Sequence, residues 1–383
     1  SEIRVNNLSN ESNTGGPTIS GITTFSSPYF FVPPVGNTAQ RPENPENGSL
    51  RFNTDSAHLE YFKGDAIGWV EVEAFHNNAS PPEAGGGYTG FIAGGNDPSP
   101  WTGLNHIDYV TITTMGNSVD FGDLLVGKTG NQTACNRTRI LFPGGYTGSG
   151  YQDSISYNNV QSKGNGVDFG DLTIVKSGAP CVANQTRGIF GPSQNQGGSP
   201  YHTNVLEYVT IPTTGDAVDF GDGREIGSVW GANSSTRGLW GSVSSSPAKV
   251  TYTTMSTLGD VIDFGTMSQR PQAGACNAVR AIWAGTYFGN SIAYSTIATL
   301  GDAIDFGDLD VSRDSPGSCS SATRGLIVGG RSIPSQLVIN TISSLEIMTL
   351  GNAVDFGDVG YMTNTTDFSR ACFTGSNGHG GSY

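Results

Sequence analysis

The sequence predicts an all-β fold, and three observations lead to this prediction. The chain of 383 residues has 55 glycines and only 14% charged residues, a composition that does not favour helices. Short runs of apolar residues alternate with polar ones, as in strands that bury one face. The letters VDFGD, or close variants of them, recur at spacings of 42 to 51 residues, which indicates a structural repeat.

The tripeptide Asp-Phe-Gly alone is the magnesium-binding motif of protein kinases. A kinase needs it once, together with a Gly-rich loop, a strand lysine and an HRD loop, and the sequence contains none of these partners. The repetition therefore favours a structural role. The repeat Asp residues are Asp120, Asp168, Asp219, Asp263, Asp305 and Asp355.

A turn is predicted before each repeat Asp. A glycine lies four residues before the Asp and is followed by Asn or Asp, as in Gly116-Asn117 and Gly301-Asp302. Between β-branched runs this dipeptide is typical of a two-residue type II′ hairpin turn, whose first central residue needs a positive φ. Eleven residues before the Asp, on the strand that enters the hairpin, five repeats have Tyr and the sixth has Ser344.

An Arg begins a further strand in each repeat, before an apolar run such as RILFPGG or RGLIVGG. Three or four strands in roughly 46 residues match a propeller blade, and a closed ring allows each blade to bury both faces. The sequence thus predicts a six-bladed β-propeller over residues 88–383, in which the leftover strand at 370–376 completes the blade begun near Gly90. The repeat Arg residues are Arg139, Arg187, Arg237, Arg280, Arg324 and Arg370.

Three segments are predicted before the propeller. Residues 1–46 are rich in Asn, Ser, Thr, Gly and Pro with little periodicity, which predicts an extended N-terminal arm. Residues 47–76 are predicted to form a small β-hairpin module. Residues 77–87, NNASPPEAGGG, predict a linker.

Two resemblances extend this interpretation. The Gly-Gly ends of three apolar strands and the regular Tyr resemble kelch-type propeller repeats, although the kelch Trp is missing. Repeats of the form TLGDAIDFGDL…ATRGLIVGG are similar to those in tail and appendage proteins of tailed, notably marine, bacteriophages. The segment NGSLRFNTDSAHLEYFKGDAIGWVEV at 47–72 resembles a module found near the start of phage tail-fibre proteins. Together these resemblances imply a virion protein whose N-terminal arm becomes ordered against the particle.

The charge and the apolar segments exclude several partners. A net charge of −14 argues against binding to nucleic acid, which needs clustered Lys and Arg, and against docking on anionic membranes. The sequence has no apolar run of 18 residues, so we expect no membrane insertion. The N-terminus lacks the apolar core of a signal peptide, and we expect a protein made in the host cytoplasm and located in the virion.

Several motifs have the letters of an active site without its context. GDLLVGKT at 122–129 matches a Walker A motif, but it lies on a predicted strand instead of a loop that opens a helix. The histidines form no metal-ligand spacing, no CxxC pair occurs, and no Gly-x-Ser-x-Gly elbow is present. The sequence therefore predicts no enzyme activity, no cofactor and no metal. Cys135, Cys181, Cys276 and Cys319 occupy nearly the same repeat position and are predicted to be buried thiols.

The repeat Asp and Arg residues invite two interpretations. Calcium is one, but its loops supply ligands at alternate positions, and the Phe-Gly that follows each Asp offers only backbone atoms. The interpretation we favour is structural, with Asp and Arg pairing between strands or blades because a buried charge needs a partner.

The connections between the Arg-led strand and the Tyr strand vary in length and content. Equivalent connections of a propeller gather on one face, so their aromatic residues would form a surface suited to stacking on sugars. The alternative is that these rings only fill their own loops. The candidate surface-binding residues are Trp101, Tyr146, Tyr151, Tyr201, His202, Tyr287 and Phe288.

These observations predict a structural protein of a phage tail or appendage that binds the host cell surface through the variable face of its propeller. We expect attachment to other virion proteins through the N-terminal region, a host-surface glycan or protein as ligand, and a homo-oligomer in the particle. Two alternatives stay open. One is a purely structural decoration or connector subunit, and the other is a glycan-degrading enzyme, for which the variable loops offer few carboxylates besides Asp97 and Asp153.

Overall fold

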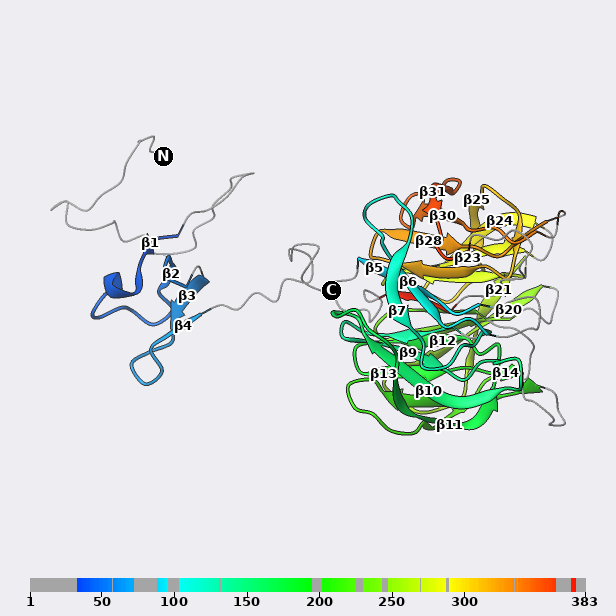
Figure 1. Ribbon diagram of the computed structural model, residues 1–383. Coiled ribbons are helices and arrows are strands. Elements are labelled where there is room, and N and C mark those ends of the chain that lie inside the picture. The colour runs from blue at the N-terminus through cyan, green and yellow to red at the C-terminus, as the bar shows by residue number, and fades with distance from the viewer. Residues whose placement is uncertain are drawn as a thin grey trace. The chain divides into compact units, whose positions relative to one another are not determined.

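The computed structural model confirms the all-β fold. It describes residues 33–56, 58–71, 88–95, 103–130, 132–194, 202–224, 230–242, 247–268, 270–286, 289–333, 335, 337–362 and 373–376. These residues form strands and one short 3-10 helix, η1 (Thr38–Gln40), and no helix among them is long and apolar enough to cross a membrane. The chain divides into two compact units, Ser1–His76 and Asn77–Tyr383, each of which is described by itself (Figure 1).

The first unit is a four-stranded sheet in the order β1-β2-β3-β4. Its strands are β1 (Val35–Gly36), β2 (Leu50–Asn53), β3 (His58–Phe62) and β4 (Trp69–Glu71). β1 runs parallel to β2, and the other pairs are antiparallel. The ring of Phe62, which is buried, lies 5.6 Å from that of Trp69 and forms the small apolar side of the sheet.

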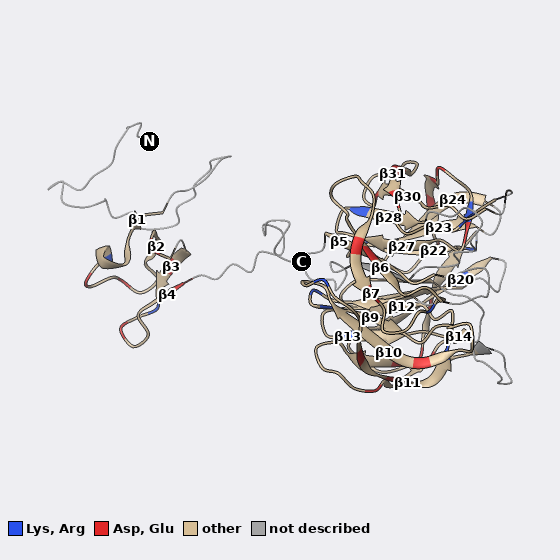
Figure 2. Cartoon of the chain, in the orientation of Figure 1, with Lys and Arg blue, Asp and Glu red and all other residues tan. Residues whose placement is uncertain are grey.

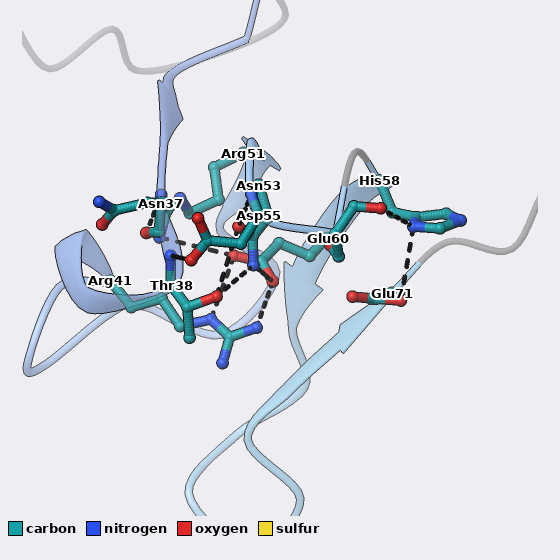
Figure 3. Close-up of polar contacts among 10 residues, drawn as sticks. Asn37, Thr38, Arg41, Arg51, Asn53, Asp55, His58, Glu60 and Glu71 are labelled. Atoms are coloured by element: carbon teal, nitrogen blue, oxygen red, sulfur yellow. Dashed lines mark hydrogen bonds and ion pairs between the residues drawn. The ribbon is translucent and has the colours of Figure 1, made fainter.

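A buried carboxylate ties the preceding segment to this sheet. Glu60 is fully buried and accepts hydrogen bonds from Arg41 Nη2 at 2.5 Å and from Asn53 Nδ2 at 3.2 Å, while Arg51 Nη1 lies 3.5 Å away (Figure 3). These contacts hold the pKa of Glu60 below its usual value, chiefly through the hydrogen bond from Arg41.

The predicted boundary of the arm at residue 46 is therefore wrong. Residues 35–41 belong to the β-sheet unit, because β1 pairs with β2 and Arg41 binds the buried carboxylate. Residues 1–32 of the predicted arm lie outside the described residues.

The described residues of the second unit form six four-stranded sheets, each antiparallel throughout and each built from four kinds of strand in the same order. The first strands are β8 (Ala134–Cys135), β12 (Cys181–Ala183), β18 (Trp230–Asn233), β22 (Ala273–Cys276), β27 (Gly317–Ser320) and β32 (Phe373–Ser376). The Arg strands are β9 (Arg139–Pro143), β13 (Arg187–Phe190), β19 (Arg237–Gly241), β23 (Arg280–Thr286), β28 (Arg324–Val328) and β5 (Thr89–Ala93).

The third and fourth positions hold the Tyr strands and the Asp strands. The Tyr strands are β10 (Gln152–Asn159), β16 (Val205–Thr210), β20 (Ala248–Thr254), β24 (Gly289–Thr296), β30 (Thr341–Glu346) and β6 (His106–Thr111). The Asp strands are β11 (Val167–Lys176), β17 (Val218–Asp222), β21 (Ile262–Met267), β25 (Ile304–Asp308), β31 (Val354–Asp358) and β7 (Val119–Asp123). Two-stranded ribbons join β14 (Ser193–Gln194) to β15 (His202–Thr203) and β26 (Arg313–Asp314) to β29 (Arg331–Ser332).

Strand β32 completes the sheet that begins with β5. Phe373 pairs with Ala93 and Ser376 with Gly90. The strand at 373–376 thus pairs with β5, near the start of the unit, as the sequence predicts. The first strands also contact one another between sheets, in the cyclic order β8, β12, β18, β22, β27, β32 and back to β8. Each sheet is thus in contact with one sheet on either side.

The connection between each Tyr strand and its Asp strand also bonds to the preceding sheet. Its glycine donates its backbone N–H to the carbonyl oxygen of the neighbouring repeat Phe, with N to O distances of 2.8–3.2 Å. The pairs are Gly164–Phe121, Gly215–Phe169, Gly259–Phe220, Gly301–Phe264, Gly351–Phe306 and, closing the cycle, Gly116–Phe356.

This bonding overturns the predicted two-residue turn. Each connection has seven residues, 112–118 in the first, and its glycine has a φ of +147° to +156°, where a type II′ turn needs about +60°. The predicted positive φ is confirmed, but it lets the backbone lie along the next sheet. The Asn or Asp after the glycine accepts a further N–H, as Asn117 does from Asp358 at 3.0 Å. These bonds satisfy the exposed edge of each Asp strand, which would otherwise invite pairing with another chain.

Apolar clusters fill the space between neighbouring sheets. One cluster joins Phe91, Ile107 and Phe121 of the β5 sheet to Ile140 and Phe142 of the β9 sheet, and all five side chains are buried. The repeat Phe also packs edge to face on the repeat Tyr of its own sheet, with ring centroids 5.9–6.1 Å apart in the five sheets that have the Tyr. The Asp-Phe-Gly motif is therefore a packing element of the core.

Candidate functional site

Of the seven predicted surface residues, the structure describes three. Trp101, Tyr201, Tyr287 and Phe288 lie outside the described residues, and His202 is described only through its backbone, as the β15 partner of Gln194. Tyr146 and Tyr151 lie in the connection between β9 and β10, and both are half-buried. The predicted aromatic surface is therefore described at one loop only.

Tyr146 and Tyr151 are in contact with each other. Their rings lie 5.9 Å apart at 82°, and the Tyr146 hydroxyl donates to the carbonyl oxygen of Gly148 at 2.9 Å. The backbone of Tyr146 exchanges two hydrogen bonds with Thr129, which follows the neighbouring Asp strand β7. These contacts support the alternative that the two rings pack within and beside their own loop.

Buried cations lie beneath these variable loops. Eight residues after the repeat Asp, three repeats have a basic residue that is fully buried and reaches the next sheet: Lys128, Lys176 and Arg313. Each donates to two carbonyl oxygens, one where the Arg strand ends and one where the Tyr strand begins. These under-loop cations hold together the two strand ends that each variable loop connects. They were not predicted, although their shared offset from the Asp is visible in the sequence.

Lys176 and Arg313 also bind acidic groups. Lys176 Nζ lies 2.5 Å from Glu207 Oε1, and both side chains are fully buried. Burial lowers the pKa of Lys176, and the charge of Glu207 opposes this shift. Arg313 Nη2 donates to Asp310 Oδ1 at 3.0 Å and to Ser343 Oγ at 2.7 Å.

Lys128 is the lysine of the Walker-like GDLLVGKT. Its Nζ donates to the carbonyl oxygens of Phe142 at 2.8 Å and Ser154 at 3.3 Å, and burial lowers its pKa to about 7. A phosphate-binding lysine must project its ammonium group toward the ligand at the start of a helix. The segment instead begins with the last two residues of β7, Gly122 and Asp123, and its remaining residues follow the strand, so no helix begins at Lys128.

The predicted pairing of the repeat Asp with the repeat Arg is wrong. All six repeat Asp side chains are exposed, so they need no buried partner. Four of the repeat Arg side chains instead stack on the Tyr ring of the neighbouring strand, with Cζ 4.4–4.8 Å from the centroid: Arg139, Arg187, Arg237 and Arg280. These four and Arg324 each donate Nη1 to a carbonyl oxygen of the following sheet at 3.0–3.1 Å. Arg370 lies outside the described residues. The strand that follows it, β32, takes the first position of its sheet, and β5, which begins at Thr89, takes the Arg-strand position, so the prediction that Arg370 begins an Arg strand is wrong.

We expect Arg187→Gln to lower the free energy of unfolding by about 1–2 kcal/mol, because it removes the stacking on Tyr208 and the hydrogen bond to Met255. Asp168→Asn is the matched control on an exposed side chain and should stay within about 0.5 kcal/mol of the parent chain. Chemical denaturation measures both values. A larger loss in Asp168→Asn than in Arg187→Gln would contradict these roles.

The cysteines and Asp108 are buried groups in the described part of the chain. Cys135, Cys181, Cys276 and Cys319 are buried thiols, as predicted, and burial raises the pKa of Cys276 to about 12. Asp108 is buried and accepts a hydrogen bond from Ser118, and burial raises the pKa of its carboxyl group. Among the described residues, no three His, Cys, Asp or Glu side chains are grouped to hold a metal ion.

Comparison with known proteins does not identify this chain. No protein-family model matches it, and no curated protein matches its sequence.

Proposed function

We propose that residues 88–383 form a six-bladed β-propeller in which each four-stranded sheet is one blade. Two cycles of contacts support this proposal: the contacts among the first strands, and the six bonds from turn glycine to repeat Phe. Both cycles run through all six sheets and return to the sheet that contains β32. Such a ring gives each blade two neighbours against which to bury its faces.

We further propose that the chain is a structural protein of a phage tail or appendage and that its variable loops bind the host cell surface. One observation carries this proposal: the recurring Gly, Phe, Tyr and Arg residues make contacts within and between sheets, whereas the connections between the Arg and Tyr strands differ between repeats in length and content. Function on a repeated scaffold is expected where the repeats differ. The ligand would be a host-surface glycan or protein, and several copies in a homo-oligomer would strengthen a weak contact.

The first unit would join the other virion proteins, together with residues 1–32. Charged side chains are sparse and scattered over the second unit (Figure 2), and the chain has a net charge of −14, so nucleic acid is not among the proposed partners. A purely structural connector is the second candidate, because the half-buried pair Tyr146 and Tyr151 is used in part for local packing. A glycan-degrading enzyme is the third candidate. Of its two predicted carboxylates, Asp153 is exposed and Asp97 lies outside the described residues.

The experiment compares two variants of the phage particle. Trp101→Ala with Tyr201→Ala should reduce host-cell adsorption while assembly stays normal, since stacking of a ring on a sugar contributes about 1 kcal/mol or more and multivalency multiplies the loss. Deleting residues 1–32 should leave a folded protein that binds cells but no longer joins the particle. If the loop variant adsorbs normally and fails to assemble, the loops mediate virion contacts and the connector candidate is correct.

A further inference from the structure

The repeat Tyr ring occupies the same place in five sheets. It packs on the repeat Phe, and a cation lies over its face: the repeat Arg of the same sheet in four cases and Lys163 in the case of Tyr109, with Nζ 5.0 Å from the centroid. Lys163 belongs to the turn of the following repeat, one residue before its glycine. The Tyr site is thus bounded by the Arg strand, the Asp strand and the next turn.

In the remaining sheet, formed by β27, β28, β30 and β31, Ser344 occupies the Tyr position. Its register is that of the other repeats, because Ser344 pairs with Val354 and Leu326 just as Tyr294 pairs with Ile304 and Ile282. A pocket of about 270 Å³ opens beside it. We name it the Ser344 pocket, and its lining includes Met115, Arg324, Ser344, Glu346, Leu350 and Val354.

The lining shares the repeat Arg and the next turn with the surroundings of a Tyr ring, whereas the repeat Phe of this sheet, Phe356, does not line the pocket. Arg324 is the counterpart of the stacking arginines, and its guanidinium is held at its edge by the carbonyl oxygen of Ile112 and by Glu346 Oε1, each at 3.0 Å. These in-plane bonds leave the faces of the guanidinium available for stacking. Met115 is the counterpart of Lys163, one residue before the turn glycine.

The rim of the pocket is apolar and open to solvent. Met115 is 62% exposed, Leu350 56% and Val354 53%. Exposed apolar side chains around a concave site are typical of a binding surface. The carboxylate of Glu346 disfavours an anionic ligand, whereas the guanidinium face favours an electron-rich ring.

We propose that the Ser344 pocket binds a phenol-like aromatic ring from outside the chain, which takes the place that the chain's own Tyr occupies in five sheets. The ring stacks on Arg324 and contacts the apolar rim. The ring can belong to a small aromatic molecule or to a tyrosine side chain of another polypeptide, and the two sources share this chemistry.

The test uses the full chain and p-cresol, the side-chain analogue of tyrosine, with binding followed by NMR line broadening or calorimetry. The parent chain should bind one p-cresol, and Ser344→Tyr should weaken this binding at least about tenfold, which corresponds to 1.4 kcal/mol, because its own ring fills the pocket. Ser344→Tyr should also raise the melting temperature. Equal binding by both chains, or no binding by the parent, would overturn the proposal.

Two further variants test the proposal even if Ser344→Tyr does not fold. Met115→Asp changes an exposed rim residue, so it should fold normally and weaken p-cresol binding, and unchanged binding would count against the proposal. Tyr294→Ser recreates the pocket in a second sheet and should raise the stoichiometry from one p-cresol to two. N-acetyl-tyrosinamide assigns the source: saturable binding supports a tyrosine on a polypeptide, whereas binding of p-cresol alone supports a small aromatic molecule.

Discussion

Replacing Gly307 with alanine should lower the free energy of unfolding by about 3 kcal/mol, as the sum of backbone strain and overpacking. Gly307 is the glycine of the fifth Asp-Phe-Gly and has a φ of +150°. A Cβ there would lie 2.4 Å from the carbonyl oxygen of Gly351 and 2.6 Å from its carbonyl carbon. Both are backbone atoms, and Gly351 is held by the bond from its N–H to Phe306, so the next turn cannot yield without losing that bond.

Gly351→Ala is the matched control for this prediction. Its φ of +154° is equally unfavourable for alanine, but a Cβ there would meet no atom within 4 Å. The control should therefore lose only about 1–2 kcal/mol, the cost of the backbone strain alone. Chemical denaturation of both variants gives the comparison. If they lost the same stability, close approach between sheets would not be the reason for the Gly of Asp-Phe-Gly.

The sequence predicts the strands of the second unit well, because each strand carries its own alternation and recurs six times. The Tyr and Asp strands contain the aligned residues, five of the Arg strands begin at the aligned Arg, and β32 completes the sheet of β5. The turn was assigned wrongly for a physical reason. Gly-Asn and Gly-Asp have the same letters whether the positive φ closes a hairpin or lets the backbone lie against another sheet, and only the three-dimensional contact distinguishes them.

The contacts of the charged residues also could not be predicted from the sequence. Asp and Arg recur together, and opposite charges suggest a pair, but exposure differs between them: the repeat Asp residues face solvent, and four of the repeat Arg residues stack on Tyr. The under-loop cations were not predicted because only three repeats have them and because two are Lys and one is Arg: Lys128, Lys176 and Arg313. Burial of a lysine cannot be deduced from its neighbours in sequence, because its partners come from the next sheet.

Glu207→Gln should lower the free energy of unfolding by about 3–5 kcal/mol, because it leaves the ammonium group of Lys176 buried without its counter-charge. Both side chains of the pair are fully buried, and Glu207 Oε2 also accepts hydrogen bonds from the N–H and hydroxyl of Thr173, both at 2.6 Å. Gln keeps the shape and an acceptor for Thr173, so the charge is the main change. Arg224→Gln is the matched control, since it removes one partner of the exposed pair Arg224–Asp263 and should cost less than about 1 kcal/mol.

The loss in Glu207→Gln should also depend on pH. Burial already lowers the pKa of Lys176, and removing the carboxylate that opposes this shift should lower it further. A lysine whose pKa is lower in the folded chain than in the unfolded chain destabilises the fold. The penalty is fully present below the folded-state pKa, and it shrinks as the pH rises from there toward the ordinary lysine value. Denaturation at pH 7 and pH 10 should therefore show a smaller gap between the variant and the parent chain at pH 10. The double variant Lys176→Met with Glu207→Gln should recover most of the stability at pH 7, and a double variant as unstable as Glu207→Gln alone would show that the buried charge is not the cause.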